Sequence, residues 1–242
     1  MTKEYVFGVI GAGNGGKAMA GYLALLGKRV MLYNRTFSHV EVIAERQGID
    51  LINPGGLEGF GKLEMVTDNI GDLLAESQVI MVVMPSSAHR DIAKAATPYL
   101  RDDHTVILNP GRTGGALEFT ETLRQNGCTT SPIIAEAETF IFASRSEGPN
   151  LARIFRIKES VPLAALPAIR TKEALNAIHT AFPQYINGGN VLMTGLNNMG
   201  AVFHPALAML NAGWIEATHG NFEFYVDGVT PSVAKVLEVI DR

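Results

Sequence analysis

Cysteine is almost absent from this chain, since Cys128 is the only one among 242 residues. A single cysteine excludes an internal disulfide framework and is typical of a reducing compartment. Charge is also modest, with 20 lysines and arginines against 24 acids and a net charge of −4. Because no block of five basic residues occurs, we expect neither a nucleic acid nor an anionic membrane as a partner.

Long apolar runs are missing as well. The longest, Val79–Met84, is far too short to cross a bilayer. The first residues lead directly into a predicted strand and show no signal-peptide pattern. With 47% apolar and 18% charged residues, the composition predicts a globular cytoplasmic protein. We expect no bound metal.

The first half of the chain alternates strand-like and helix-like segments. Its predicted strands are short and fully apolar, which is typical of a parallel sheet covered on both faces. The pattern therefore predicts an α/β, Rossmann-type, doubly wound and mostly parallel sheet. The predicted strands are Tyr5–Ile10, Arg29–Tyr33, Val79–Met84 and Thr105–Leu108, and the predicted helices are Gly15–Leu26, Ala88–Ala96 and Ala116–Gln125.

The second half changes character. Five glycines and one proline between residues 48 and 70 predict a hairpin-like excursion off the sheet. Further strands are predicted at Ile133–Ala135, Phe140–Phe142 and Arg153–Ile157, and helices at Thr171–Phe182, Asn190–Ala201, Pro205–His219 and Pro231–Ile240. We therefore predict two domains, a nucleotide-binding domain over residues 1–183 and a smaller all-α domain over residues 184–242.

Gly11, Gly13 and Gly16 form the pattern G-x-G-x-x-G between a predicted strand and a predicted helix. The first glycine permits a tight turn, the second lets a pyrophosphate approach the backbone, and the third lets the helix pack closely on the strand. The helix N-terminus offers free N–H groups to the anion. Within a β-α-β unit this pattern predicts a dinucleotide site that includes Asn14 and Gly15, and a glycine-rich turn without a ligand is the alternative.

The second predicted strand ends in Asn34, Arg35 and Thr36, where a carboxylate that binds the ribose of NAD is often found. No acid here repels a 2′-phosphate, and an arginine pairs well with one. The sequence therefore favours NADP(H). If Arg35 instead stacks on adenine or is solvated, NAD is accepted.

A second glycine-rich loop, Leu108–Phe119, also follows a strand and opens a helix. Ligands of open α/β sheets lie beyond the carboxyl ends of the strands, so this loop is expected to border the nicotinamide or the substrate. Asn109 and Arg112 are its candidate contacts, and Pro85 is the corresponding candidate after the preceding strand. A plain turn with a surface arginine is the alternative.

His204 is the candidate acid/base group among six histidines. It lies in a stretch with few charges, and Pro205 after it suits the first turn of a helix. We expect the imidazole to face an apolar cleft, where a pKa near neutrality suits proton transfer. A buried histidine with a purely structural role is the alternative.

Several motifs together resemble the opine dehydrogenases, a family that includes octopine dehydrogenase, and the resemblance runs nearly end to end. The motifs are GAGNGG at Gly11–Gly16, NPGRTGGALEF at Asn109–Phe119, AEAETFIFASR at Ala135–Arg145, NNMGAVFHPALAMLNAGWIE at Asn197–Glu216 and FYVDGVTPSVAKVLEVID at Phe224–Asp241.

The resemblance implies a reductive condensation of an amino acid with a 2-oxo acid, in which NAD(P)H reduces an imine. It makes His204 the catalytic acid/base and places Glu136, Thr139 and Asn198 on the substrate side. It also implies a homodimer. In the family the helical domain continues beyond the last motif and carries an aspartate that orients the histidine. This chain is either a fragment or a natural short form. A fragment that lacks the aspartate is expected to bind cofactor, to turn over poorly, and to self-associate through an exposed apolar face.

Two other functions stay open. A sister reductase of the ketopantoate-reductase or glycerol-3-phosphate-dehydrogenase type uses a lysine on its helical domain, whereas Asn190–Phe203 contains none. The second alternative is a non-catalytic NAD(P)-binding module.

Overall fold

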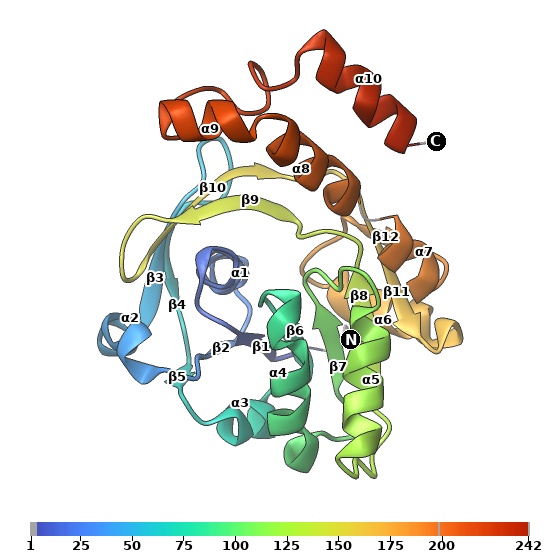
Figure 1. The fold of residues 1–242 in the computed structure, drawn as a ribbon. Coiled ribbons are helices and arrows are strands. Elements are labelled where there is room, and N and C mark those ends of the chain that lie inside the picture. Colours follow the sequence, from blue (N-terminus) through green and yellow to red (C-terminus); the bar gives the residue numbers. More distant parts are fainter. Residues whose placement is uncertain (1–3, 198, 242) are drawn as a thin grey trace. The chain divides into compact units, whose positions relative to one another are not determined.

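The computed structural model describes residues 4–197 and 199–241, with the backbone alone for residues 201 and 202. It contains two compact units, Met1–Leu196 and Asn197–Arg242 (Figure 1). No helix in these described ranges has the length and apolarity needed to cross a membrane.

The first unit is built around an eight-stranded sheet in the order β12-β11-β8-β7-β6-β1-β2-β5 (Figure 1). All neighbouring strands are parallel except β8 and β11. The central strands are completely buried, as their apolar sequences predict. The strands are β1 (Phe7–Ile10), β2 (Val30–Tyr33), β5 (Met65–Thr67), β6 (Val79–Val82), β7 (Thr105–Leu108), β8 (Ile133–Ala137), β11 (Val161–Leu166) and β12 (Tyr185–Asn187).

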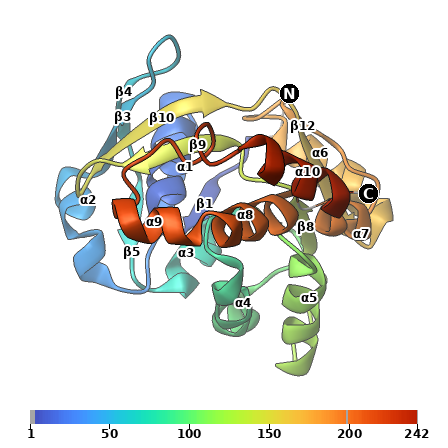
Figure 2. The ribbon, with the colours of Figure 1, turned by 45° about the horizontal axis from the view of Figure 1, so that its top comes forward.

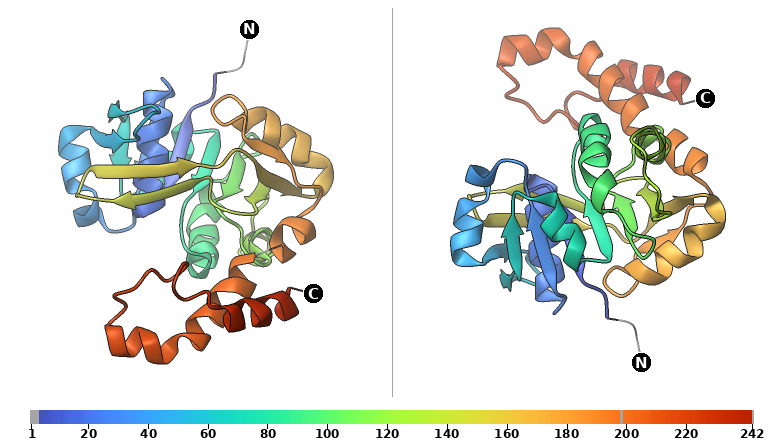
Figure 3. Two further views of the ribbon diagram at one scale, coloured as in Figure 1. Left: turned by 90° about the horizontal axis from the view of Figure 1, so that it is seen from above. Right: turned by 90° about the horizontal axis from the view of Figure 1, so that it is seen from below.

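Helices cover both faces of this sheet, which confirms the doubly wound class. One apolar core joins the sheet to α1 (Asn14–Leu25) and α6 (Thr171–Ile178). A second core joins the opposite face to α3 (Ile70–Glu76), α4 (His89–Ala96) and α5 (Gly115–Gln125). The green helices α4 and α5 lie side by side (Figures 1 and 3).

A second, four-stranded sheet packs on α1. Its order is β4-β3-β10-β9, formed by β3 (Gly48–Ile52), β4 (Gly59–Lys62), β9 (Phe142–Ser146) and β10 (Leu151–Ile157). The antiparallel pair β3–β4 confirms the hairpin excursion. In Figure 2 the yellow strands β9 and β10 cross over α1. Gly61 allows the close approach of β4 to α1, because a Cβ there would lie 2.6 Å from the Gly21 carbonyl oxygen.

Smaller helices complete the first unit. The short helix α2 (Glu41–Arg46) follows β2, and α7 (Val191–Leu196) ends the unit. The sequence analysis put the join near Pro183, whereas the contacts divide the chain after Leu196. The physical reason for the difference is that β12 pairs with β11 in the main sheet and α7 packs against β8 and β11.

The second unit contains α8 (Met199–Leu210), α9 (Ala212–Thr218) and α10 (Pro231–Ile240). Asn211 joins its parts, because its buried amide donates to the carbonyls of Leu207 and Gly228 at 2.9 Å each. Thr230 caps α10 by accepting from Val233 N.

Two helix predictions in this region were wrong. The single helix predicted over Asn190–Ala201 is α7 plus the start of α8. Pro205 does not open a helix but lies inside α8. A proline removes one helical N–H, but the apolar residues on both sides continue the helix in spite of that loss.

His89 is an unusual core residue of the first unit. It opens α4 and is 0% exposed, and neither ring nitrogen hydrogen-bonds to another described group. Burial lowers the pKa of His89, and the charge of Glu118 and the nearby Met84 backbone oppose this only in part. The folded state therefore favours the neutral imidazole.

We expect His89 to make the first unit less stable in acid. Below pH 6.5 the unfolded chain binds a proton that the folded chain refuses, so the free energy of unfolding falls by up to about 1.4 kcal/mol per pH unit. In the H89L variant the free energy of unfolding, measured by denaturant titration, should decline less steeply as the pH falls from 7 into the acid range. The matched control H39L, at an exposed histidine, should keep the wild-type slope, and an unchanged slope in H89L would refute this role.

Candidate functional site: a glycine turn and the cavity beside it

The glycine turn lies where β1 ends and α1 begins, at the carboxyl edge of the main sheet. Gly11 has a φ of +105°, which favours glycine, and a Cβ there would collide with Met84. A Cβ at Gly16 would overlap the carbonyl oxygen of Gly11, so α1 packs directly beneath the turn. At Gly13 a Cβ would meet nothing within 4 Å, so this exposed backbone is open to a ligand.

The side chain of Asn34 holds the turn to the loop after β2. Its Oδ1 accepts a hydrogen bond from Ala12 N at 3.3 Å, and its Nδ2 donates to the carbonyl of Thr36 at 2.8 Å. The backbone supports the same junction, since Gly11 N donates to the Tyr33 carbonyl at 2.8 Å. Asn34 thus shapes the site through both ends of its amide.

Asn14 and Gly15 fix the start of α1 from the other side. Asn14 Oδ1 accepts from Ser146 N on β9 at 2.9 Å. Gly15 packs against the ring of Phe140, where a Cβ would lie 2.9 Å from the ring carbons. The segment after β8 therefore lies directly beside the glycine turn.

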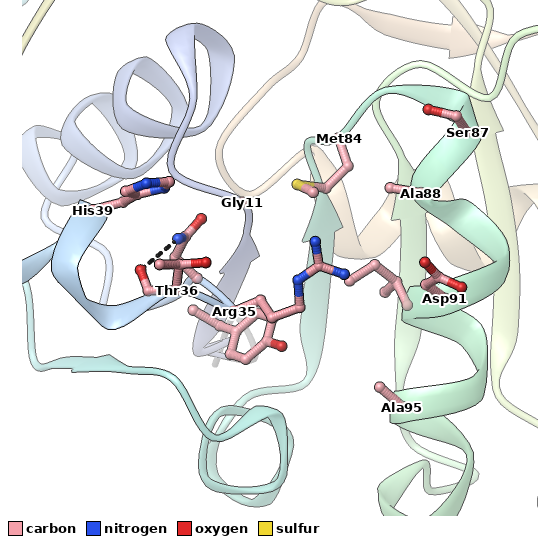
Figure 4. Close-up of a pocket in the computed structure, with 12 residues that line it drawn as sticks. Gly11, Arg35, Thr36, His39, Met84, Ser87, Ala88, Asp91 and Ala95 are labelled. Carbon is pink, nitrogen blue, oxygen red and sulfur yellow. Dashed lines mark hydrogen bonds between the residues drawn. The ribbon is translucent and has the colours of Figure 1, made fainter.

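A cavity of about 490 Å³ opens beside this turn, wholly within the first unit (Figure 4). One wall is the end of β2 and the loop after it, and the other is the end of β6 and α4. Pro85 stands between the lining residues Met84 and Ser87. The lining residues are Gly11, Tyr33, Asn34, Arg35, Thr36, His39, Met84, Ser87, Ala88, Asp91, Ile92 and Ala95.

Arg35 extends across this cavity toward the wall formed by α4 (Figure 4). Its side chain is exposed, and within the described ranges no hydrogen bond or ion pair holds it. The loop after β2 contributes Asn34, Arg35 and Thr36 to the lining and no acid. An uncommitted guanidinium at this place suits an anionic group on the ligand.

Asn109 lies elsewhere in the fold and has a different environment. It is 2% exposed, its Nδ2 donates to the Ile107 carbonyl at 2.7 Å, and its Oδ1 accepts from the Tyr185 hydroxyl at 2.8 Å. Burial raises the pKa of Tyr185, so the hydroxyl stays a donor. The Asn109 amide is thus occupied in joining β7 to β12, and it does not line the cavity.

Glu136 is a carboxylate buried at the end of β8, with 1% of its surface exposed. Its Oε2 accepts from Ala116 N in the first turn of α5, and its Oε1 accepts from Thr194 Oγ1, both at 2.8 Å. Burial raises the pKa of Glu136, and these two hydrogen bonds oppose the rise. Glu136 therefore joins β8, α5 and α7 inside the first unit.

Thr139 follows β8 and lies among charged side chains. Its Oγ1 accepts from Lys158 Nζ at 2.7 Å. Burial and then the charge of Arg112 lower the pKa of Lys158, while Glu138 raises it. The segment with Thr139 leads into Phe140 and so reaches the glycine turn. Sequence reasoning missed Lys158 because it is distant in the chain from every motif used.

His204 lies on α8 in the second unit, where its side chain is exposed. Its Nδ1 is 3.2 Å from the Tyr225 hydroxyl, and the ring packs edge-on against Phe203. Within the second unit it therefore has a phenol as its partner, which sequence reasoning did not foresee. Asn198 falls outside the described residues.

Comparisons with known proteins match both halves of the chain. Residues 7–125 match the NAD-dependent glycerol-3-phosphate dehydrogenase N-terminus, and residues 187–242 match the alpha-helical domain of NAD/NADP octopine/nopaline dehydrogenase. A curated opine dehydrogenase from Arthrobacter sp. (strain 1C) is 38% identical over 241 residues, covering 100% of this chain and 66% of that protein. The chain belongs to the opine dehydrogenase family.

Two solved opine dehydrogenases share the fold. Yersinopine dehydrogenase with NADP+ bound superposes with a TM-score of 0.77 at 16% identity, over 98% of this chain and 62% of that one. Octopine dehydrogenase with NADH and L-arginine superposes with a TM-score of 0.73 at 17% identity, over 86% of this chain and 54% of that one. This chain thus spans 54–66% of the opine dehydrogenases it matches. The family relationship confirms a nicotinamide cofactor and leaves the choice between NAD and NADP open.

Two alanine variants of the glycine turn should have different effects in this member of the opine dehydrogenase family. G16A should lower the free energy of unfolding by about 2 kcal/mol or more, because the new methyl group overlaps the Gly11 carbonyl. G13A should leave stability nearly unchanged but weaken NADPH binding at least about tenfold, because the methyl group projects into the space that the diphosphate needs.

Thermal unfolding and fluorescence titration with NADPH measure the two effects separately. G27A tests a glycine far from the turn and should leave NADPH affinity unchanged, although its φ of +75° makes it mildly destabilising. If G13A binds NADPH like the wild type, the diphosphate does not lie against this backbone.

Proposed function

We propose that this protein is an NADP(H)-preferring opine dehydrogenase that joins the amino group of an amino acid to a 2-oxo acid. The observation that carries the proposal is the cavity beside the glycine turn, in which Arg35 extends from a loop that contributes no acid. The identity to the Arthrobacter opine dehydrogenase supports the reaction class. The cofactor residues are those of the turn and of the loop Asn34–Thr36.

In the proposed reaction the amine adds to the oxo carbon, water leaves, and an imine forms. A bound NADPH would supply the hydride that reduces the imine carbon, and one proton completes the secondary amine. The chain's contribution is to bind, to orient and to move protons. The Gly13 backbone and the start of α1 hold the diphosphate, and Arg35 with Thr36 holds the 2′-phosphate.

His204 is the proposed acid/base group on the oxo oxygen, with Tyr225 orienting its imidazole through Nδ1. Thr139, held by Lys158, is proposed to contact the substrate. For Glu136 the proposal is narrower, because both of its oxygens already accept hydrogen bonds: it shapes the loop that opens α5. Asn109 has a similar indirect role through Tyr185.

A glycerol-3-phosphate-dehydrogenase type of reductase is the second candidate, favoured by the match over residues 7–125. NADPH consumption separates the two functions. With pyruvate, an opine dehydrogenase consumes NADPH only when an amino acid is added, whereas a hydroxy-acid reductase consumes it without amine. No turnover with any tested pair, but saturable cofactor binding, would instead identify a binding module.

Arg35 should decide the cofactor preference. In R35Q we expect NADPH affinity to fall about 10- to 100-fold while NADH affinity changes little, because only NADPH carries the 2′-phosphate that a guanidinium binds. Fluorescence titration with both cofactors measures the ratio. R29Q is the matched control, because Arg29 precedes β2 and pairs with Glu64. An equal loss of affinity for NADPH and NADH would show that Arg35 does not bind the 2′-phosphate.

His204 should affect turnover and not cofactor binding, since the cavity is lined wholly by the first unit. In H204Q we expect the rate of NADPH oxidation, with pyruvate and an amino acid that wild type accepts, to fall at least about 100-fold. Y225F should lose less, because it removes only the orienting hydroxyl. If H204Q keeps the wild-type rate, the catalytic proton comes from another group.

A further inference from the structure

The wall of the cavity opposite Arg35 has its own chemistry. Met84, the α4 N-cap residue Ala88, and Ile92 and Ala95 on α4 make it largely apolar. Residues three, four and seven apart share a helix face, so this surface is continuous. Asp91 lies on the same face and is the only acid among the residues that line the cavity.

Asp91 is exposed and makes no hydrogen bond or ion pair with any group in residues 4–197 and 199–241. Its place in the first turn of α4 is favoured by the helix dipole. The dipole explains why an acid is tolerated there, but not why it lines a cavity whose expected ligand is anionic. A carboxylate in such a place is stabilised by a hydrogen-bond donor on the ligand.

The end of the ligand that enters this cavity follows from the fold. The loop after β2 meets the adenosine ribose in dinucleotide-binding sheets, so the base is expected between this loop and the helix that follows β6, the strand on the other side of β1. Here that helix is α4. An apolar surface suits the face of a purine, and the adenine edge carries one strong donor, the exocyclic amine.

We propose that Asp91 accepts a hydrogen bond from the exocyclic amine of the cofactor's adenine, so that the cavity discriminates adenine from a 6-oxo purine. Ala88, Ile92 and Ala95 cover one face of the base. The inference rests on the proposed cofactor site, but it does not depend on the choice between NAD and NADP or on the substrates.

The test compares the affinities of NADPH and NADH with those of their hypoxanthine analogues, in which an oxygen replaces the amine. For the wild-type chain we expect each analogue to bind about tenfold or more weakly, the ratio typical of a lost charge-assisted hydrogen bond. In D91A the ratio should fall close to one. In D91N it should fall or reverse, since the amide also donates to the 6-oxo group.

E118Q is the matched control, because Glu118 is likewise an acid in the first turn of a helix but does not line the cavity. It should keep the wild-type ratio. Two results would overturn this inference but leave the proposed cofactor site standing, provided that all nucleotides bind. One is an adenine-to-hypoxanthine affinity ratio near one in the wild type, and the other is an equal ratio in the wild type and D91A. An equal gain of all four nucleotides in D91A would show simple repulsion and would also overturn it. If no nucleotide binds, the proposed cofactor site fails with it.

Discussion

The contact between Gly16 and the carbonyl of Gly11 is the constraint on which the site depends. It brings the start of α1 into direct backbone contact with the end of β1, where a side chain would otherwise stand. Any Cβ at Gly16 would push the helix away from the turn, and with it the N–H groups that we propose to bind the diphosphate. The surrounding contacts serve the same geometry: Asn34 fixes the turn to the loop after β2, and Asn14 fixes the helix to β9.

The second sheet explains why α1 is so well fixed. The hairpin β3–β4 and the strands β9 and β10 enclose the helix on the side away from the main sheet. Lys17, buried in the first turns of α1, donates to Ser146 Oγ and to the Gly148 carbonyl at 2.9 Å each. Burial lowers the pKa of Lys17, and the two acceptors that hold its ammonium group are both neutral. The orientation of this helix end, which we propose to bind the cofactor's diphosphate, is therefore set by the strands of the second sheet.

The two walls of the cavity differ in charge and polarity. Arg35 brings a cation to the end of β2, whereas α4 brings apolar residues and one acid. Within the second unit, the Tyr225 hydroxyl lies 3.2 Å from Nδ1 of His204, so a neutral hydroxyl is the polar partner of this imidazole.

The sequence by itself determined the glycine turn and the parallel strands, because these depend on local backbone demands and on short apolar periods. Its motifs indicated the family by resemblance. It predicted β7 and α10 with their bounds, and it singled out Arg35 as a cofactor contact, a residue that the structure places in the lining of a cavity. Only the tertiary structure decided what the polar residues do. Asn109 and Glu136 are occupied by Tyr185, Thr194 and Ala116, which lie far from them in the chain. Whether a polar group is free for a ligand depends on partners that folding brings together, and no local pattern encodes them.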